Sequence, residues 1–162
     1  MAEQHASVVR EGAVAGLLGA TAVAVWFLVV DIINGQPLYT PSMLGGAVLS
    51  LFGPRGAEGT AVFVTVYTIV HGLAFIGLGI LLTFFVHKAE SDPEVIAAII
   101  VLFIIFELGF TGLTALLAES PTFGRLAWYQ VGLANAVAAF VMGFFLWKRH
   151  PRLKAGWSHA FD

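Results

Sequence analysis

The residues of this chain that could do chemistry are a few polar side chains within long apolar segments. His71 stands in the stretch YTIVHGLAFIGLG, residues 67–79, while Glu107 and Asn135 stand in two later apolar segments. A charged side chain at the centre of a membrane helix costs about 2.5–3.5 kcal/mol even on lenient insertion scales, so such a residue usually marks a function. An imidazole, a carboxyl group and a carboxamide offer hydrogen bonds, ion pairing and proton binding to each other or to a ligand.

These three residues are predicted to lie at a similar depth in a membrane. Each stands roughly 14–16 Å below the surface that the charge pattern makes the outer one, at 1.5 Å per helical residue. Side chains three or four residues away share a helix face. Tyr67 and Thr68 have this spacing from His71, and Thr111 and then Thr114 continue the face of Glu107 outward. We therefore expect a polar cluster that runs from the midplane towards the outer surface.

The remaining polar residues make this pattern one-sided. Asp31 and Asn34 stand at the outer end of the first apolar run, where Asp31 is either solvated by the interface or caps the next helix. In the inner halves of the second and third runs Thr83 is the only polar side chain, and it can bond to its own backbone. A transporter or proton path needs polar groups towards both faces, so the pattern favours a one-sided pocket.

Two interpretations of the cluster stay open. The polar side chains can tie helices together, because intramembrane hydrogen bonds contribute about 0.6 kcal/mol on average, or they can bind a ligand. We predict no catalytic residue and no metal site, because the chain has no nucleophile–base pair and no metal-ligand spacing. No cofactor is required, although His71 alone suffices to contact a pigment or a quinone. The other histidines are predicted to be solvated at the inner helix ends: His5, His87, His150 and His159.

The composition indicates that these residues are positioned by membrane helices. Of 162 residues, 59% are hydrophobic and 11% are charged, and the mean hydropathy is +0.89, whereas a soluble domain carries roughly a quarter charged residues. The net charge of −2 gives no sign of nucleic acid as a partner. A chain without cysteine has no disulfide framework and no thiolate chemistry.

The apolar runs predict an all-α fold, a four-helix transmembrane bundle that forms a single membrane domain over residues 1–162. A bilayer core about 30 Å thick needs about 20 apolar residues per span. Four runs meet this length, at about 12–34, 60–87, 95–118 and 125–147. Between the first two, residues 41–52 predict a short helix, with Thr40 as its N-cap and Pro41 at its first position. At about 18 Å it is too short to cross, so it should be interfacial or re-entrant.

The distribution of basic residues predicts the orientation. Lysine and arginine favour the cytoplasmic side of membrane helices. Six of them lie in the N-terminal segment, the second loop and the C-terminal segment, and two lie in the first and third loops. We therefore expect both termini in the cytoplasm, in a bacterial inner membrane, with the short helix on the outer side.

Small residues on the first and fourth runs predict faces for close helix packing. The fourth run has such a face at Gly132, Ala136, Ala139 and Gly143, with Asn135 adjoining it. Gly12 and Gly16 form a similar pair on the first run. Small residues let membrane helices approach closely. We expect these faces to pack within the bundle, with contact to another subunit as the alternative.

The motifs also resemble a family of small four-span bacterial membrane proteins of unknown function. The stretches that carry the resemblance are GAVAGLLGATAVAVWFLVVDIINGQPLYTPSMLG, YTIVHGLAFIGLG and FELGF, within residues 12–110. The matching positions are Trp26, Asp31, Thr40, Pro41, Leu44, Gly45, Tyr67, Thr68, His71 and Glu107. The resemblance implies the four-span fold and this choice of residues, and it implies no mechanism.

We expect a non-enzymatic role from these observations. The leading hypothesis is an accessory or structural subunit of a larger membrane complex, such as an energy-transducing one. It packs its small-residue and aromatic faces against that complex and is surrounded by membrane lipids. The first alternative is a binding protein for a lipophilic molecule, such as a quinone, pigment or lipid, held by His71, Glu107 and Asn135. The second alternative is a transporter or proton-coupled carrier.

Overall fold

The computed structural model describes residues 2–53, 59–92, 94–116 and 128–151. Side chains are described in the same ranges except at residues 2–6, 102, 106, 109–116 and 128. The elements are α1 (Ala2–Ile33), α2 (Tyr39–Ser50), α3 (Thr60–Ala89), α4 (Glu94–Leu116) and α5 (Trp128–Arg149). Within these ranges every regular element is a helix, which confirms the all-α prediction.

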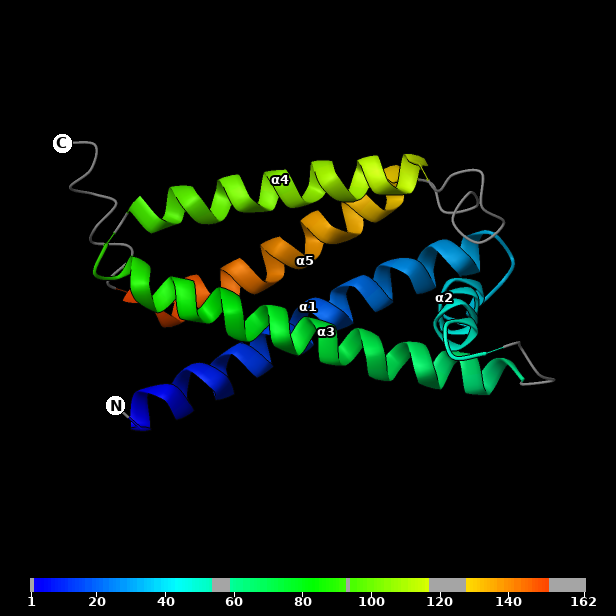
Figure 1. The fold of residues 1–162 in the computed structure, drawn as a ribbon, viewed down its shortest axis with the longest axis horizontal. Helices are drawn as coiled ribbons and strands as arrows, with labels where there is room; N and C mark the ends of the chain where they lie inside the picture. The colour runs from blue at the N-terminus through cyan, green and yellow to red at the C-terminus, as the bar shows by residue number, and fades with distance from the viewer. Residues whose placement is uncertain (1, 54–58, 93, 117–127, 152–162) are drawn as a thin grey trace.

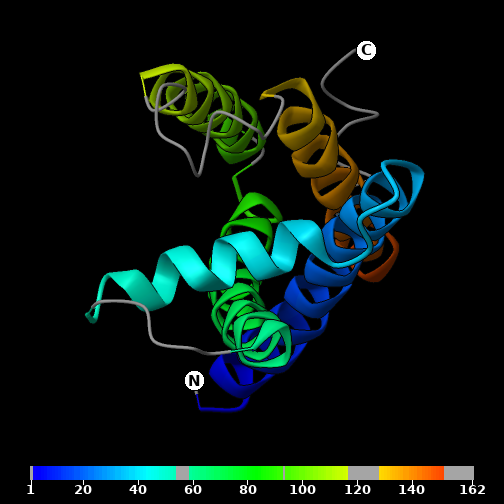
Figure 2. The same cartoon turned by 90° about the vertical axis from the view of Figure 1, so that its right-hand side faces the viewer.

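The four longer helices run along the long axis of the molecule, and α2 lies across one end (Figure 1). Turned by 90°, the same view shows α2 side-on while α3 is seen along its axis (Figure 2). The most extensive contacts are those of α1 with α3 and α5 and those of α2 with α3. The contacts of α4 with α3 and α5 are fewer, so α4 lies at the edge of the bundle.

The contact between α1 and α3 is close because glycines meet at the crossing. A Cβ atom on Gly16 would overlap the carbonyl of Phe75, and one on Gly79 would overlap the carbonyl of Gly12. Only glycine permits this approach of two backbones, which increases van der Waals contact where lipid supplies no hydrophobic drive. The expectation that Gly12 and Gly16 pack within the bundle is confirmed here.

The side of α5 that packs against α1 carries its own buried row. Val131, Ala134, Ala138, Met142 and Leu146 recur every three or four residues, as a single helix face requires. Val23 and Phe27 of α1 join this row in one buried cluster, with Trp26 and Phe75 packed against it. The core of the protein therefore lies between α1, α3 and α5.

Among the described residues, three helices are long and apolar enough to cross a membrane by their length and composition: Ser7–Ile33, Thr60–Ala89 and Tyr129–Arg149. In α4 the described side chains form an apolar segment at Glu94–Ile105, and the side chains at 106 and 109–116 lie outside the described ones. The predicted membrane character is therefore supported by three helices. The fourth crossing stays a prediction.

The short helix exists as predicted, but it starts earlier. It begins at Tyr39 after Leu38, whose φ of 67° lies in the left-handed region, and Leu38 supplies no side-chain cap. Thr40 lies inside the first turn, so its prediction as the N-cap is wrong. Gly45 brings α2 against α3, because a Cβ there would overlap the carbonyl of Phe63.

Candidate functional sites

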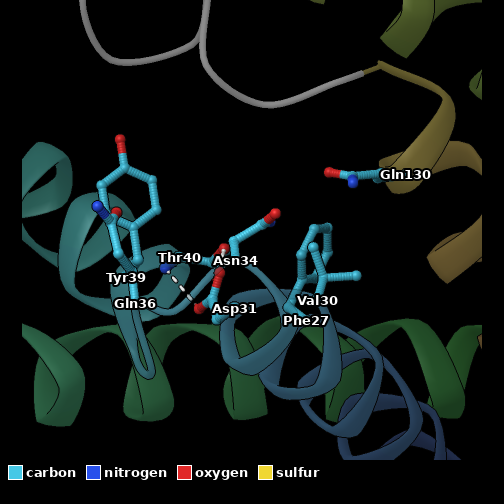
Figure 3. Close-up of a pocket in the computed structure, with 8 residues that line it drawn as sticks. All are labelled: Phe27, Val30, Asp31, Asn34, Gln36, Tyr39, Thr40 and Gln130. Atoms are coloured by element: carbon cyan, nitrogen blue, oxygen red, sulfur yellow. Dashed lines mark hydrogen bonds between the residues drawn. The ribbon is translucent and has the colours of Figure 1, made fainter.

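The C-terminal end of α1 is joined to α2 through Asp31. The Thr40 N–H donates to Oδ2 of Asp31 and the Thr40 hydroxyl donates to Oδ1, each at 2.8 Å (Figure 3). Both residues are 3% exposed. The first backbone N–H groups of a helix have no partner within the helix, so a carboxylate that accepts one acts as a cap from outside. Of the two interpretations that the sequence left open for Asp31, these contacts support capping of the short helix over solvation by the interface.

A cavity of about 250 Å³ opens beside this pair. In Figure 3, Gln130 of α5 lies across this space from Asp31, Asn34 and Tyr39. The lining residues are Phe27, Val30, Asp31, Asn34, Gln36, Tyr39, Thr40 and Gln130. The carboxylate at its base already accepts two hydrogen bonds, so the groups open to a ligand are the carboxamides and the phenol.

His71 lies at the interface of α3 with α1. Its Nε2–H donates to the carbonyl oxygen of Ala20 at 3.2 Å. Its ring stacks on Tyr67 at 4.9 Å between centroids and meets Phe75 at 4.7 Å with the planes tilted. In these contacts His71 ties two helices together and fills the space between aromatic rings.

Glu107 lies on α4 with its carboxyl group near Gly132 of α5, and Asn135 lies on α5, three residues after Gly132. Both are half-buried. Oε2 of Glu107 lies 3.8 Å from where a Cβ would stand on Gly132, and its Oε1 is buried without a hydrogen-bond partner among the described residues. Within the part of the chain with described side chains, no hydrogen bond joins Glu107 or Asn135 to His71.

The threonine hydroxyl groups that were predicted to belong to this cluster have separate outcomes. Thr68 donates to the carbonyl of Val64 at 2.7 Å, so its hydroxyl is satisfied by its own helix. The side chains of Thr111 and Thr114 lie outside the described ones. The single midplane cluster of His71, Glu107 and Asn135 stays a prediction, and the described contacts of His71 and Glu107 are with α1 and α5 respectively.

The opposite end of the bundle holds a second polar cluster that the sequence did not indicate. His150, directly after α5, is 5% exposed, so its prediction as a solvated histidine is wrong. Its Nδ1–H donates to Oε1 of Glu90 at 2.9 Å, and its Nε2 lies 3.3 Å from Oε1 of Glu11. The half-buried ring of His87 meets it edge to face at 4.5 Å. His5 and His159 lie outside the described side chains.

The signal for this cluster was present in the spacing along α3. Gly79, Thr83, His87 and Glu90 follow one another at four, four and three residues, so they share one face. Gly79 already packs on α1, and the same face therefore carries His87 and Glu90 towards the helix ends. Thr83 is fully buried and its hydroxyl has no partner among the described residues, so the prediction that it bonds to its own backbone is wrong.

The predicted small-residue face of α5 is turned away from α1. Ala136 and Gly143 are exposed, and a Cβ built on Gly143 would meet no atom within 4 Å. Gly132 and Ala139 are half-buried. The row that packs on α1 stands one or two residues further round the helix, at Val131, Ala134, Ala138, Met142 and Leu146.

No model of a known protein family matches this chain, and neither a curated protein nor a solved structure matches it. The resemblance to small four-span bacterial membrane proteins therefore stays an expectation from the motifs alone. The function has to be argued from the geometry of the described residues.

Proposed function

We propose that this protein is a non-enzymatic, four-span protein of the bacterial inner membrane, with both termini in the cytoplasm, that serves as an accessory subunit of a larger membrane complex. The observation that carries the proposal is the small-residue face of α5. Its partner is a transmembrane helix of another subunit with small residues of its own, because that chemistry matches the face.

The argument rests on how membrane helices associate. Lipid tails are as apolar as leucine, so association depends on close packing, and small residues permit it. The α1–α3 crossing shows that this chain uses glycines in this way. On α5 a similar row at Gly132, Ala136, Ala139 and Gly143 stands partly open, flanked by the exposed, stacked rings of Phe140 and Phe144. Such a face, shaped for a helix and not filled by α1, fits a second subunit.

A matched pair of glycine variants tests the proposal. Gly143 and Gly77 are both exposed, and a Cβ on either meets nothing within 4 Å, but Gly77 lies on α3 outside the row. With a tagged chain in its native membrane, Gly143→Leu should reduce the stoichiometric recovery of a multi-pass partner at least tenfold, while Gly77→Leu should leave it unchanged. Equal recovery with both variants would contradict the proposal.

A separate experiment tests the topology. The chain has no cysteine of its own, so single cysteines can be introduced and labelled one at a time. Single cysteines at Asn34 and Ser91 should react with an impermeant thiol reagent from opposite sides of the membrane. A reporter fused to residue 162 should lie on the side of Ser91, as an even number of spans requires. A reporter on the side of Asn34 would show that α4 does not cross.

A second function is favoured by Glu107. Its Oε1 is buried without a hydrogen-bond partner among the described residues. An unsatisfied buried polar group lowers the stability of a fold by about 1–3 kcal/mol. The indole N–H of Trp26 is likewise buried without a partner among the described residues. A lipophilic molecule with a hydroxyl or carbonyl group would satisfy such groups. Absorption spectra and mass spectrometry of the purified protein should then show one co-eluting molecule, which Glu107→Ala and His71→Ala would reduce.

A further inference from the structure

Three side chains from three segments converge at the end of the bundle opposite α2. One donor atom from each of Glu11, His87 and His150 lies within 4.8 Å of the others. Glu11 comes from α1, His87 from α3, and His150 follows the last residue of α5. The side chains of Glu11 and His150 are 10% and 6% exposed, so the cluster is largely shielded from solvent.

The outer contacts of the two histidines fix which nitrogen carries the hydrogen. A carbonyl oxygen only accepts, so the contact of 3.0 Å between Nδ1 of His87 and the Thr83 carbonyl places a hydrogen on that nitrogen. The contact of His150 Nδ1 with the Glu90 carboxylate does the same. In both neutral rings Nε2 then bears the lone pair. Histidines that bind metals are held in this way, with the other N–H on a carboxylate or a backbone carbonyl.

The inner atoms of the cluster lack the partners that a purely structural network would have. Nε2 of His150 and Oε1 of Glu11 are both buried and make no hydrogen bond among the described residues. Their separation of 3.3 Å is close to the edge of a tetrahedron with metal–ligand bonds of about 2.05 Å, which is about 3.3 Å. Two imidazoles and one carboxylate are a ligand set of zinc sites that keep an open fourth position.

We propose that Glu11, His87 and His150 form a binding site for Zn²⁺, with Glu90 and the Thr83 carbonyl as the groups that orient the histidines. The Glu11 and Glu90 carboxylates balance the charge of a divalent ion. The fourth ligand position is open to water or to a donor from another molecule. The ion links α1, α3 and the end of α5, so binding it stabilises the contact of these helices.

The competing interpretation is an ion network without a metal. A protonated His150 would then lie between the carboxylates of Glu11 and Glu90, and His87 would only pack against it. This network explains the contact of 2.9 Å to Glu90. It also explains the separation of 3.3 Å between Nε2 of His150 and Oε1 of Glu11, and it gives His87 no role beyond packing against His150. The two interpretations differ in whether a transition metal binds with defined geometry.

Titration with Co²⁺ tests the site, because tetrahedral Co²⁺ has an intense visible absorption and Zn²⁺ displaces it. The full chain, without an affinity tag, is purified in detergent and stripped of metal with EDTA. We expect one Co²⁺ per chain with a tetrahedral spectrum, and loss of that spectrum in His87→Ala and Glu11→Gln. Glu90→Gln should keep the spectrum but weaken binding by about 10–100-fold, as changes to orienting groups do.

Two controls separate the site from adventitious binding and from misfolding. His5→Ala combined with His159→Ala removes the other histidines of the terminal segments and should leave the titration unchanged. The partly exposed His87 is the preferred variant, because His150 is buried and its loss can disturb folding. Size exclusion and circular dichroism check the fold of each variant. A wild-type protein without the tetrahedral spectrum, or the same spectrum in His87→Ala, would overturn the proposal.

Discussion

Removing the Asp31 carboxylate should destabilise the end of the bundle where α2 lies. The effect should be larger than that of substituting an exposed residue nearby. Asp31→Ala removes both acceptors of the Thr40 N–H and hydroxyl, and it leaves these donors in a place that is 3% exposed. A hydrogen bond to a charged group contributes about 1.5–3 kcal/mol. With the lower value for each of the two bonds, the free energy of unfolding should fall by about 3 kcal/mol.

The two bonds can be separated by changing the partner. Thr40→Val keeps the N–H bond and removes only the hydroxyl bond, so it should cost about 1.5 kcal/mol. In Asp31→Ala the hydroxyl bond is already lost, so adding Thr40→Val should cost little more. A double-mutant cycle should therefore give a coupling of about 1.5 kcal/mol between these two side chains.

The assay is reversible unfolding by SDS in mixed micelles, followed by tryptophan fluorescence. Asn34→Ala is the control, because Asn34 lines the same cavity, is exposed and has no side-chain hydrogen bond among the described residues. It should stay within about 0.5 kcal/mol of the wild type, as exposed substitutions usually do. If Asp31→Ala falls within the same range, or if the coupling is absent, the assignment of Asp31 as the cap of α2 is refuted.

Two further predictions concern the α1–α3 interface, with the same unfolding assay. Gly16→Leu should lower the free energy of unfolding by about 3 kcal/mol, the upper end for overpacking, because its Cβ meets the backbone of Phe75. Gly77→Leu, where a Cβ meets open space, should lower it by less than about 0.5 kcal/mol. An equal effect of both would show that the helices do not cross at these glycines. His71→Phe should cost only about 0.6 kcal/mol, because the ring stacking is kept and one bond to Ala20 is lost. A loss several times larger would indicate a polar role beyond this bond.

The sequence predicted the elements well where they depend on local rules. Apolar length located the long helices, while the position of Asp31 before a short helix left capping and solvation by the interface as alternatives. The N-cap prediction for Thr40 was wrong because the helix starts two residues earlier, after the left-handed Leu38. A cap that is supplied by a residue of another helix depends on the path of the chain between the two helices. Local sequence preferences do not predict that path.

The candidate sites were harder to predict because they depend on which helix faces which. Matching depth suggested that His71, Glu107 and Asn135 meet, but depth does not fix the rotation of each helix. His71 contacts α1, while Glu107 lies near α5. The cluster of Glu11, His87 and His150 joins residues more than 60 positions apart, and charged residues at helix ends are usually solvated. Only the shared face of Gly79, Thr83 and His87 pointed towards it.

The polar groups near the middle and at the C-terminal end of α3 bear on the carrier hypothesis. The sequence argued against a carrier because the inner half looked apolar, and the buried cluster at His87 and His150 weakens that argument. The crossing of α1 and α3 supplies a steric argument against a carrier instead. His71 lies on one side of Gly79 and His87 on the other, and at Gly79 the two backbones are too close for a Cβ atom. A chain of water molecules along this interface would need space that the contact at Gly79 fills, so this contact separates the two polar regions along α3.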